Sequence, residues 1–415
     1  MTRIIGNDAT AGDLRTQIED LGRELRPALW SILESVAGPQ PRPTRVARAL
    51  ALDKSLASRL VRAAQADTDL ELMHIVPSPA GLGILAQSAA RVADPAAIED
   101  LRAATERFQS LLDTVPGGRT AIDAQISESS YAVREKSEQI AKQASFKSMS
   151  FLLGQFCDVL ATALFLVPSE NGRTVDGIEI SRRIGLRRMR PSTPLALLSF
   201  HVAPEDERPG DSIQFVPIDG DAAEKHPTAF LLPEYSTRPL PELEVMREGS
   251  ITTLVLPPDP SVHAPAQLTS AFRIRNGWLR EPDAAVQSLR GYVLHVPARR
   301  LVRDVFVAEG LYPGATPKVS FVLPGPRAST PPPGDSGPRH FTTIDLATSI
   351  EQLPPAPYAF ALPGVRDHAA ATAHVLARAG HAATRFRGWR CAITYPVPLV
   401  EMIWWLAHPD LEPRK

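Results

Sequence analysis

Cysteine is nearly absent from this chain, since only Cys157 and Cys391 occur in 415 residues. Two cysteines exclude a disulfide framework and a cysteine-rich zinc module. No apolar run reaches the roughly 18 residues of a membrane-spanning helix, and the first residues lack the apolar core of a signal peptide. We therefore expect a cytoplasmic protein without a membrane partner.

Motifs typical of enzymes are also missing from the sequence. The glycine pairs at 81/83 and 117/118 lack the further glycines and the Lys-Ser or Lys-Thr of a phosphate-binding loop, and no Gly-x-Ser-x-Gly motif occurs. His368, His374 and His381 are spaced too widely for metal ligands on one helical face, so we expect them at the surface. The sequence thus predicts no catalytic residues, no metal and no cofactor.

The composition that remains is that of a globular protein with a surplus of proline. Hydrophobic residues make up 44% and charged residues 22%, and 45 basic residues nearly balance 46 acidic ones. Residues 1–150 favour helices, whereas most of the 40 prolines follow, between short apolar runs. The runs predicted as strands are 163–167, 193–202, 212–218, 229–232, 250–256, 271–274, 292–296, 319–322, 340–344 and 389–395.

Residues 42–63 predict two short helices joined by a tight turn. Thr44 can cap the first helix and Asp53 the second, and Leu52 fills the turn between them. The expected inward-facing residues are Val46, Ala47 and Leu50 in the first helix and Leu56, Ala57, Leu60 and Val61 in the second. Small residues at positions 47 and 51 would let the two helices cross closely.

Residues 46–60 resemble the helix-turn-helix of bacterial repressors, including the lac repressor family. Ala51 stands where that turn usually has glycine, and Asp53 stands where the usual cap is serine. The positions that carry the likeness are Ala47, Leu52, Ala57, Ser58 and Arg59, where the pattern has Ala, Val, Val, Ser and Arg. The resemblance covers about 20 residues and does not extend to that family's sugar-binding half, because residues 155–415 do not alternate strands with helices.

The resemblance implies which side chains would contact DNA. The predicted set is Arg42, Thr44, Arg45, Lys54, Ser55, Ser58, Arg59 and Arg62. The start of the second helix would read base edges through Lys54, Ser55 and Ser58, with Arg59 as a further candidate, whereas Arg42, Arg45 and Arg62 would lie near phosphates. Between residues 40 and 66, six basic residues stand against one acidic residue, a local excess that suits phosphate binding.

We therefore expect an α+β protein with an all-helical N-terminal helix-turn-helix domain and a mostly antiparallel, β-rich α+β region after it. The predicted segments are a DNA-binding domain (1–92), a helical linker or dimerisation region (93–153), a β-rich domain (154–323), a proline-rich flexible loop (324–339) and a C-terminal α+β segment (340–415).

The function predicted from these features is sequence-specific transcriptional regulation. The partners would be double-stranded DNA and a second copy of the chain, with the C-terminal region sensing a small-molecule effector or assembling the homodimer. Three alternatives stay open: a helical hairpin with solvated arginines, an interaction scaffold without catalysis, and an unfamiliar enzyme or small-molecule-binding protein whose helix-turn-helix is regulatory.

Two stripes of apolar residues favour helix packing, either within the chain or between copies. The first, broken at Pro27, is Leu14, Ile18, Leu21, Leu25, Ala28 and Ile32. The second is Ile122, Ile126, Val133, Ser137, Ile140 and Ala144. Ser-Pro at 78–79 and Asp-Pro at 94–95 each predict the start of a helix, whereas residues 70–76 read as a short strand or wing.

Three more segments have two interpretations each. Arg182, Arg183, Arg187, Arg188 and Arg190 favour a solvated strand edge over an anion-binding surface. Residues 385–390 interleave arginine with Phe386 and Trp389, as in a base-stacking platform, but strand alternation favours placing both rings partly inside. Residues 401–406 are too short to cross a membrane and are core or a partner contact.

Overall fold

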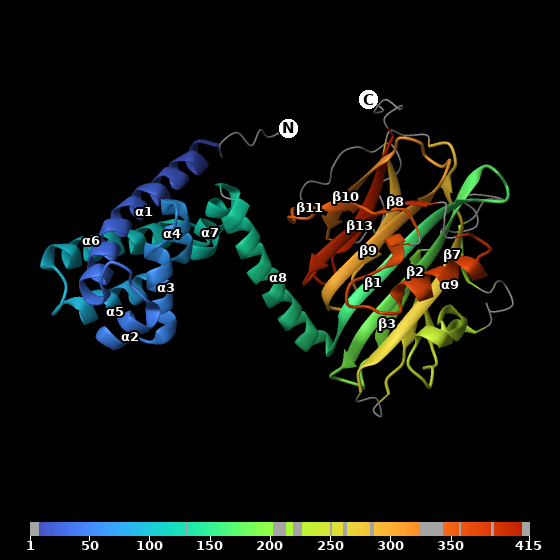
Figure 1. Ribbon diagram of the computed structural model, residues 1–415, viewed down its shortest axis with the longest axis horizontal. Coiled ribbons are helices and arrows are strands. Elements are labelled where there is room, and N and C mark those ends of the chain that lie inside the picture. Colours follow the sequence, from blue (N-terminus) through green and yellow to red (C-terminus); the bar gives the residue numbers. More distant parts are fainter. Residues whose placement is uncertain are drawn as a thin grey trace. The chain divides into compact units, whose positions relative to one another are not determined.

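The computed structural model (Figure 1) describes residues 8–129, 131–201, 213–218, 226–249, 251–259, 264–282, 286–323, 343–356, 358–382 and 386–408. The predicted proline-rich loop, 324–339, lies outside these residues. The chain divides into two compact units, residues 1–137 and 138–415. Helices make up the first unit and strands dominate the second, which confirms the predicted α+β class.

The first unit is a bundle of helices. Its elements are α1 (Asp8–Ala37), α2 (Pro43–Ala49), α3 (Lys54–Ala64), α4 (Asp69–Ile75), α5 (Pro79–Ala89), α6 (Pro95–Thr114), α7 (Gly118–Ser129) and the start of α8 (Tyr131–Leu153). Both predicted Xaa-Pro helix starts are confirmed, because the Ser78 hydroxyl accepts the Gly81 N–H at 3.4 Å and the Asp94 carboxylate accepts the Ala96 N–H at 3.0 Å.

The first apolar stripe packs inside this bundle. Ile18, Leu25 and Ile32 are fully buried in the common core of the first unit, so of the two interpretations the structure shows packing within the chain. The expected break at Pro27 is wrong, since α1 continues to residue 37. Burial of the neighbouring leucines offsets the roughly 3 kcal/mol that an interior proline costs a helix.

Residues 70–76 form helix α4, so the predicted strand or wing is wrong. The Thr68 hydroxyl caps this helix by accepting the Glu71 N–H at 3.1 Å, and acidic Asp69 and Glu71 occupy its first turn, where the helix dipole favours negative charge. The second stripe does not form one face, because Ile122 and Ile126 are buried in the first unit whereas Ile140 is 65% exposed.

In the described part of the second unit, the strands form three sheets. Its strands are β1 (Gln155–Pro168), β2 (Thr174–Arg188), β3 (Leu195–His201), β4 (Gln214–Pro217), β5 (Glu244–Glu248), β6 (Ile251–Leu256), β7 (Ala266–Leu279), β8 (Val286–Val293), β9 (Ala298–Ala308), β10 (Thr316–Val322), β11 (Thr343–Ile344), β12 (Ile350–Gln352), β13 (Phe386–Thr394) and β14 (Glu401–Ala407). The sheet orders are β12-β13-β9-β1-β2-β7-β4, β11-β10-β14-β8 and β3-β6-β5. Among the described pairs, β1 and β9 run parallel and the others antiparallel, which confirms the mostly antiparallel prediction.

The two faces of the large sheet pack on different neighbours. Leu160 and Leu164 of β1 join a core that includes Trp404 of β14. Phe165, one residue further along the alternating strand, faces the other way and stacks on Phe306 with ring centroids 4.6 Å apart. That face is covered by the short helix η5 (Tyr358–Phe360) and by α9 (His368–Arg378).

Most predicted strands correspond to observed ones, and residues 401–406 lie in the core strand β14. The strand predicted at 229–232 is wrong, because Pro227 starts a short 3-10 helix, η3 (Pro227–Phe230). The list of predicted strands omits β2 and β9, two central strands of the large sheet, although the arginines at 182–190 favour a strand edge in the sequence. Both carry buried arginines in place of continuous apolar residues, which hides them from a search for apolar runs.

Candidate functional site

Helices α2 and α3 and the turn between them form the candidate site. Ala51 in the turn adopts a left-handed backbone with φ +51°, the conformation for which glycine is the usual residue. The Leu52 N–H then donates to the Ala47 carbonyl at 3.0 Å, and the Leu52 side chain is buried. Position 51 thus has the backbone conformation expected where a repressor turn carries glycine.

Asp53 caps α3, as predicted. Its Oδ1 accepts the Ser55 N–H at 2.7 Å and the Ser55 hydroxyl at 2.5 Å, and these hydrogen bonds lower the pKa of Asp53 below its usual value. The predicted cap at Thr44 is wrong. Helix α2 begins at Pro43, whose fixed φ suits the first helical position, so Thr44 already lies inside the helix.

The two faces of α3 differ in character. Ala57, Leu60 and Val61 are buried in the core of the first unit, and Leu56 is partly buried against it. Opposite them, Lys54, Ser55 and Arg62 are exposed and Ser58 is half-buried. This arrangement confirms the predicted inward face and leaves the polar face of α3 toward solvent.

The cations around α2 and α3 fall into two groups. Arg42, Arg48, Lys54 and Arg62 are exposed and have no carboxylate partner among the described residues. Thr44 is exposed beside them on α2. The structure therefore brings most of the predicted DNA-contacting residues onto exposed surface of α2 and α3.

Arg45 and Arg59 are exposed, but each already donates a hydrogen bond to a backbone carbonyl. Arg45 Nη1 donates to the Ala37 carbonyl at 3.2 Å, and Arg59 Nε donates to the Ile75 carbonyl at 2.9 Å. Arg59 thereby satisfies a carbonyl at the C-terminal end of α4, where the helix dipole favours a cation. Sequence reasoning missed this second role, because nothing local to α3 indicates that the end of α4 lies beside it.

A chain of polar side chains fastens α7 and α8 to α4. Asp123 Oδ1 lies 3.1 Å from His74 Nδ1, and His74 Nε2 lies 3.2 Å from the Ser137 hydroxyl. This is the order of a serine hydrolase triad, which sequence reasoning did not find because the three residues come from three helices. However, Arg119 also holds Asp123, with Nε 3.2 Å from each carboxylate oxygen, and Ser137 lies inside α8, whose backbone amides are engaged by the helix. We therefore infer that these hydrogen-bonded side chains hold the three helices in position.

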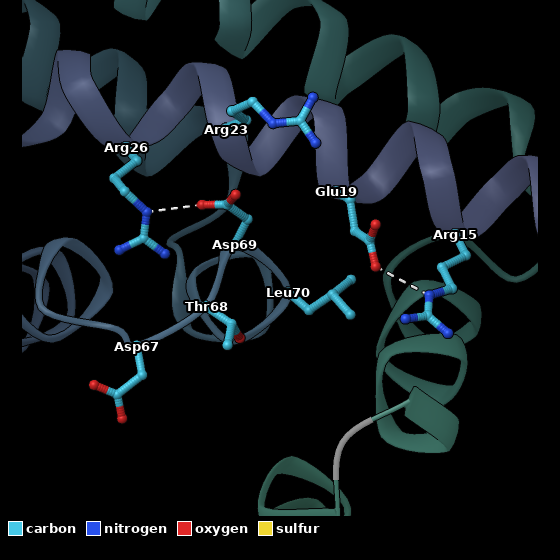
Figure 2. Close-up of a pocket in the computed structure, with 8 residues that line it drawn as sticks. All are labelled: Arg15, Glu19, Arg23, Arg26, Asp67, Thr68, Asp69 and Leu70. Carbon is cyan, nitrogen blue, oxygen red and sulfur yellow. Dashed lines mark hydrogen bonds and ion pairs between the residues drawn. The ribbon is translucent and has the colours of Figure 1, made fainter.

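A cavity of about 610 Å³ opens between α1 and the connection from α3 to α4 (Figure 2). Arg26 of α1 donates from Nε to Asp69 at 2.7 Å and from Nη1 to the Ala66 carbonyl at 2.6 Å. Arg15 pairs with Glu19 across 3.0 Å in the same wall. Arg26 thus links α1 to the segment between the end of α3 and the start of α4, whereas the Arg15–Glu19 pair lies within α1.

The arginine-rich segment 182–190 is only partly exposed, with Arg187 and Arg190 at the surface. Arg182, Arg183 and Arg188 are buried, so the predicted solvated strand edge is wrong for these residues. Their side chains leave β2 on both faces of the strand. Arg182 donates a hydrogen bond to the Asp367 carboxylate, and Arg183 and Arg188 donate to backbone carbonyls. Trp389 is buried and Phe386 half-buried, which confirms the interpretation that both rings lie partly inside.

The predicted surface position of His368 is also wrong, because its side chain is buried at the start of α9. His374 and His381 are half-buried. Within the described residues, no group of three or more His, Cys, Asp or Glu side chains is arranged to hold a metal ion. None of the helices in the same residues combines the length and apolar character that crossing a bilayer requires.

Comparisons with known proteins do not show a family for this chain. No family model and no curated protein matches this chain. Among solved structures, one from Parabacteroides distasonis, described as a "putative protease", is 8% identical with a TM-score of 0.23. The match covers 62% of this chain and 41% of the other, so this chain spans about two fifths of that protein's length. So low a similarity supports no functional argument.

Proposed function

We propose that the protein is a sequence-specific DNA-binding transcriptional regulator, with α2 and α3 as a helix-turn-helix. The observation that carries the proposal is the combination at α3: a left-handed residue in the turn, a carboxylate cap at Asp53, a buried apolar face and an exposed face with Lys54 and Arg62. All four features suit a recognition helix, because it must be held rigidly while one face enters the major groove.

The exposed side chains divide into two roles. Lys54, Ser55 and Ser58 at the start of α3 read base edges, because the N-terminal residues of a recognition helix are those that reach them. The Ser55 hydroxyl donates to Asp53, so its oxygen remains an acceptor for a base amino group. Arg42, Arg45 and Arg62 contact phosphates and set the register of the helix without reading sequence.

Homodimerisation and ligand sensing belong to the same proposal. One helix-turn-helix offers few base contacts, and two copies on half-sites a helical turn apart multiply the specificity. The second unit, residues 138–415, would assemble the dimer or bind the effector.

The test is selection of bound sequences from a random duplex pool at about 150 mM salt, where non-specific phosphate binding is weakened. Enrichment of a two-fold symmetric sequence supports both DNA reading and dimerisation. Recovery of the starting pool without enrichment, from a protein whose circular dichroism shows it folded, contradicts the proposal.

Two variants then test the assigned roles. Arg59→Ala should weaken binding to the selected site more than to random DNA, whereas Arg45→Ala should weaken both about equally and flatten the salt dependence by about one charge. Because Arg59 also holds the Ile75 carbonyl, thermal unfolding of Arg59→Ala separates a lost base contact from a loosened α4. Arg102→Ala, on exposed surface of α6, is the matched control. Equal losses for both variants on both DNAs would contradict the roles.

A further inference from the structure

Arg182 is a fully buried cation in the middle of β2. Its Nη2 donates to Asp367 Oδ2 at 2.8 Å, and its Nε approaches the Thr269 hydroxyl at 3.3 Å. Its Nη1 is buried without a hydrogen-bond partner. The other buried arginine atoms that lack partners in the described residues are all Nε atoms, so Arg182 differs in leaving a terminal donor of its guanidinium fork unused.

The residues around Arg182 come from β7 and from the start of α9. Asp367 directly precedes α9, and its side chain makes no cap hydrogen bond to that helix. Gln267 of β7 also donates to Asp367 Oδ2, at 3.3 Å. The buried His368 follows, with its Nδ1 lacking a partner, and burial lowers the pKa of His368 to about 3, helped by the nearby charges of Arg182 and Arg390. A neutral imidazole and an unused arginine donor therefore lie in one cluster.

Asp367 accepts a hydrogen bond from only one of the two terminal nitrogens of Arg182. A carboxylate satisfies a buried guanidinium best when it accepts from two of its nitrogens in parallel. Asp367 reaches one terminal nitrogen and cannot be fully withdrawn from solvent, since its side chain is 46% exposed. A carboxylate that is free of the backbone could bind both nitrogens and would enter where Asp367 now meets solvent.

We propose that Arg182, Thr269, Asp367 and His368 form a binding site for a small carboxylic acid, in which the Asp367 side chain is an internal occupant that the ligand displaces. The ligand's carboxylate takes the Arg182 fork, and the unpartnered Nδ1 of His368 supplies a second polar contact. This site lies wholly in the second unit, so the proposal does not depend on DNA binding by the first unit.

The experiment uses acetate, which reproduces the aspartate side chain, and follows thermal unfolding of the full chain. Asp367→Ala removes the internal occupant, and acetate should then stabilise the protein saturably, beyond sodium chloride at equal ionic strength. Wild type should show the same response at acetate concentrations about tenfold higher, because Asp367 competes for Arg182.

Two further variants make the result specific. Arg182→Met combined with Asp367→Ala removes both charges, which keeps the interior neutral, and should abolish the acetate response. Asp158→Ala removes an exposed carboxylate that pairs with Arg299 and should leave the response as in wild type. The proposal is overturned if Asp367→Ala gains no stability from acetate over chloride, if wild type does not respond at any acetate concentration, or if the double variant still responds.

Discussion

Arginine plays opposite parts in the two units. In the first, Arg48 and Arg62 lie exposed on short helices, without a carboxylate partner in the described part of the chain. In the second, Arg303 and Arg390 are buried and hold Glu179 and Asp304 at 2.7 Å. In the sequence, the arginines of both units look alike, because each stands among apolar residues.

The difference comes from what lies on the neighbouring element. Asp304 of β9 stands directly opposite Arg390 of β13 in the antiparallel register, so a buried guanidinium meets a carboxylate across the strands. Helices α2 and α3 offer no such partner, and Asp53 is already engaged as a cap. A cluster of arginines therefore indicates a binding surface only when no acidic residue packs beside it.

The largest expected effect comes from breaking a buried pair in the second unit. Asp304→Asn leaves Arg390 charged and unpaired in the sheet interior, which should cost about 3–5 kcal/mol of unfolding free energy in urea titrations. Replacing both residues, Asp304→Leu with Arg390→Met, should recover most of that loss. Asp158→Asn, in an exposed pair, should change stability by less than about 1 kcal/mol. A small effect for Asp304→Asn would contradict the view that the arginines of the second unit depend on buried partners.

The second effect is a loss of stability in mild acid, to which His368 contributes together with His295, whose pKa burial lowers to about 4. The folded-state pKa of His368 is about 3, mainly through burial, against an ordinary value of 6.5. Below pH 6.5 the unfolded chain therefore binds a proton that the folded chain refuses, so stability falls as pH decreases toward 3. Between pH 7 and pH 5 this costs about 2 kcal/mol.

His368→Gln should flatten that pH dependence by the same amount in chemical unfolding at pH 5 and pH 7. His226→Gln is the control, because His226 is exposed. An unchanged slope in His368→Gln would show that His368 takes up its proton in the folded protein.

The third effect concerns the exposed arginines of the first unit and should leave stability intact. Arg62→Ala should lower DNA affinity and reduce the salt dependence by about one charge, while the unfolding free energy changes by less than about 0.5 kcal/mol. Fluorescence anisotropy on a labelled duplex at several salt concentrations measures the first quantity. If Arg62→Ala instead destabilised the fold and left DNA affinity unchanged, the contrast between the two units would fail.

The smallest effect tests the turn between α2 and α3. Ala51→Gly removes the strain of a left-handed alanine, at the cost of greater freedom in the unfolded chain, and should stabilise the first unit by roughly 0.5–1 kcal/mol. The reverse substitution, Gly83→Ala in α5, is the control. The added Cβ would have no atom within 4 Å, so the higher helix propensity of alanine should stabilise the protein by a similar amount. Destabilisation by Ala51→Gly in thermal unfolding would show that the turn does not need the left-handed conformation.

Local signals in the sequence predicted the helical part well. Asp53, Ser78 and Asp94 all cap helices where expected, because a cap depends on residues within one turn. The errors at Thr44 and Pro27 arose where a proline stands near the position that decides the helix boundary. At Thr44 the preceding proline starts the helix earlier, and at Pro27 tertiary burial outweighs the missing hydrogen bond.

The strand region was predicted less completely, and for a different reason. Strands β2 and β9 have alternate residues in two separate cores, and both cores accept arginine where a carboxylate or carbonyl faces it. The acceptors for Arg183 and Arg303 lie 14 and 124 residues away in the chain. No local pattern marks such pairs.

The sequence alone determined where α3, α5 and α6 start, which residues of α3 face inward, and the mixed α+β class with mostly antiparallel strands. These follow from capping, periodicity and turn chemistry, all of which act over a few residues. Tertiary structure decided the rest. It set which arginines are buried, which histidines have lowered pKa values and which side chain of α3 also contacts α4, because distant partners decide where a charge lies in a folded protein.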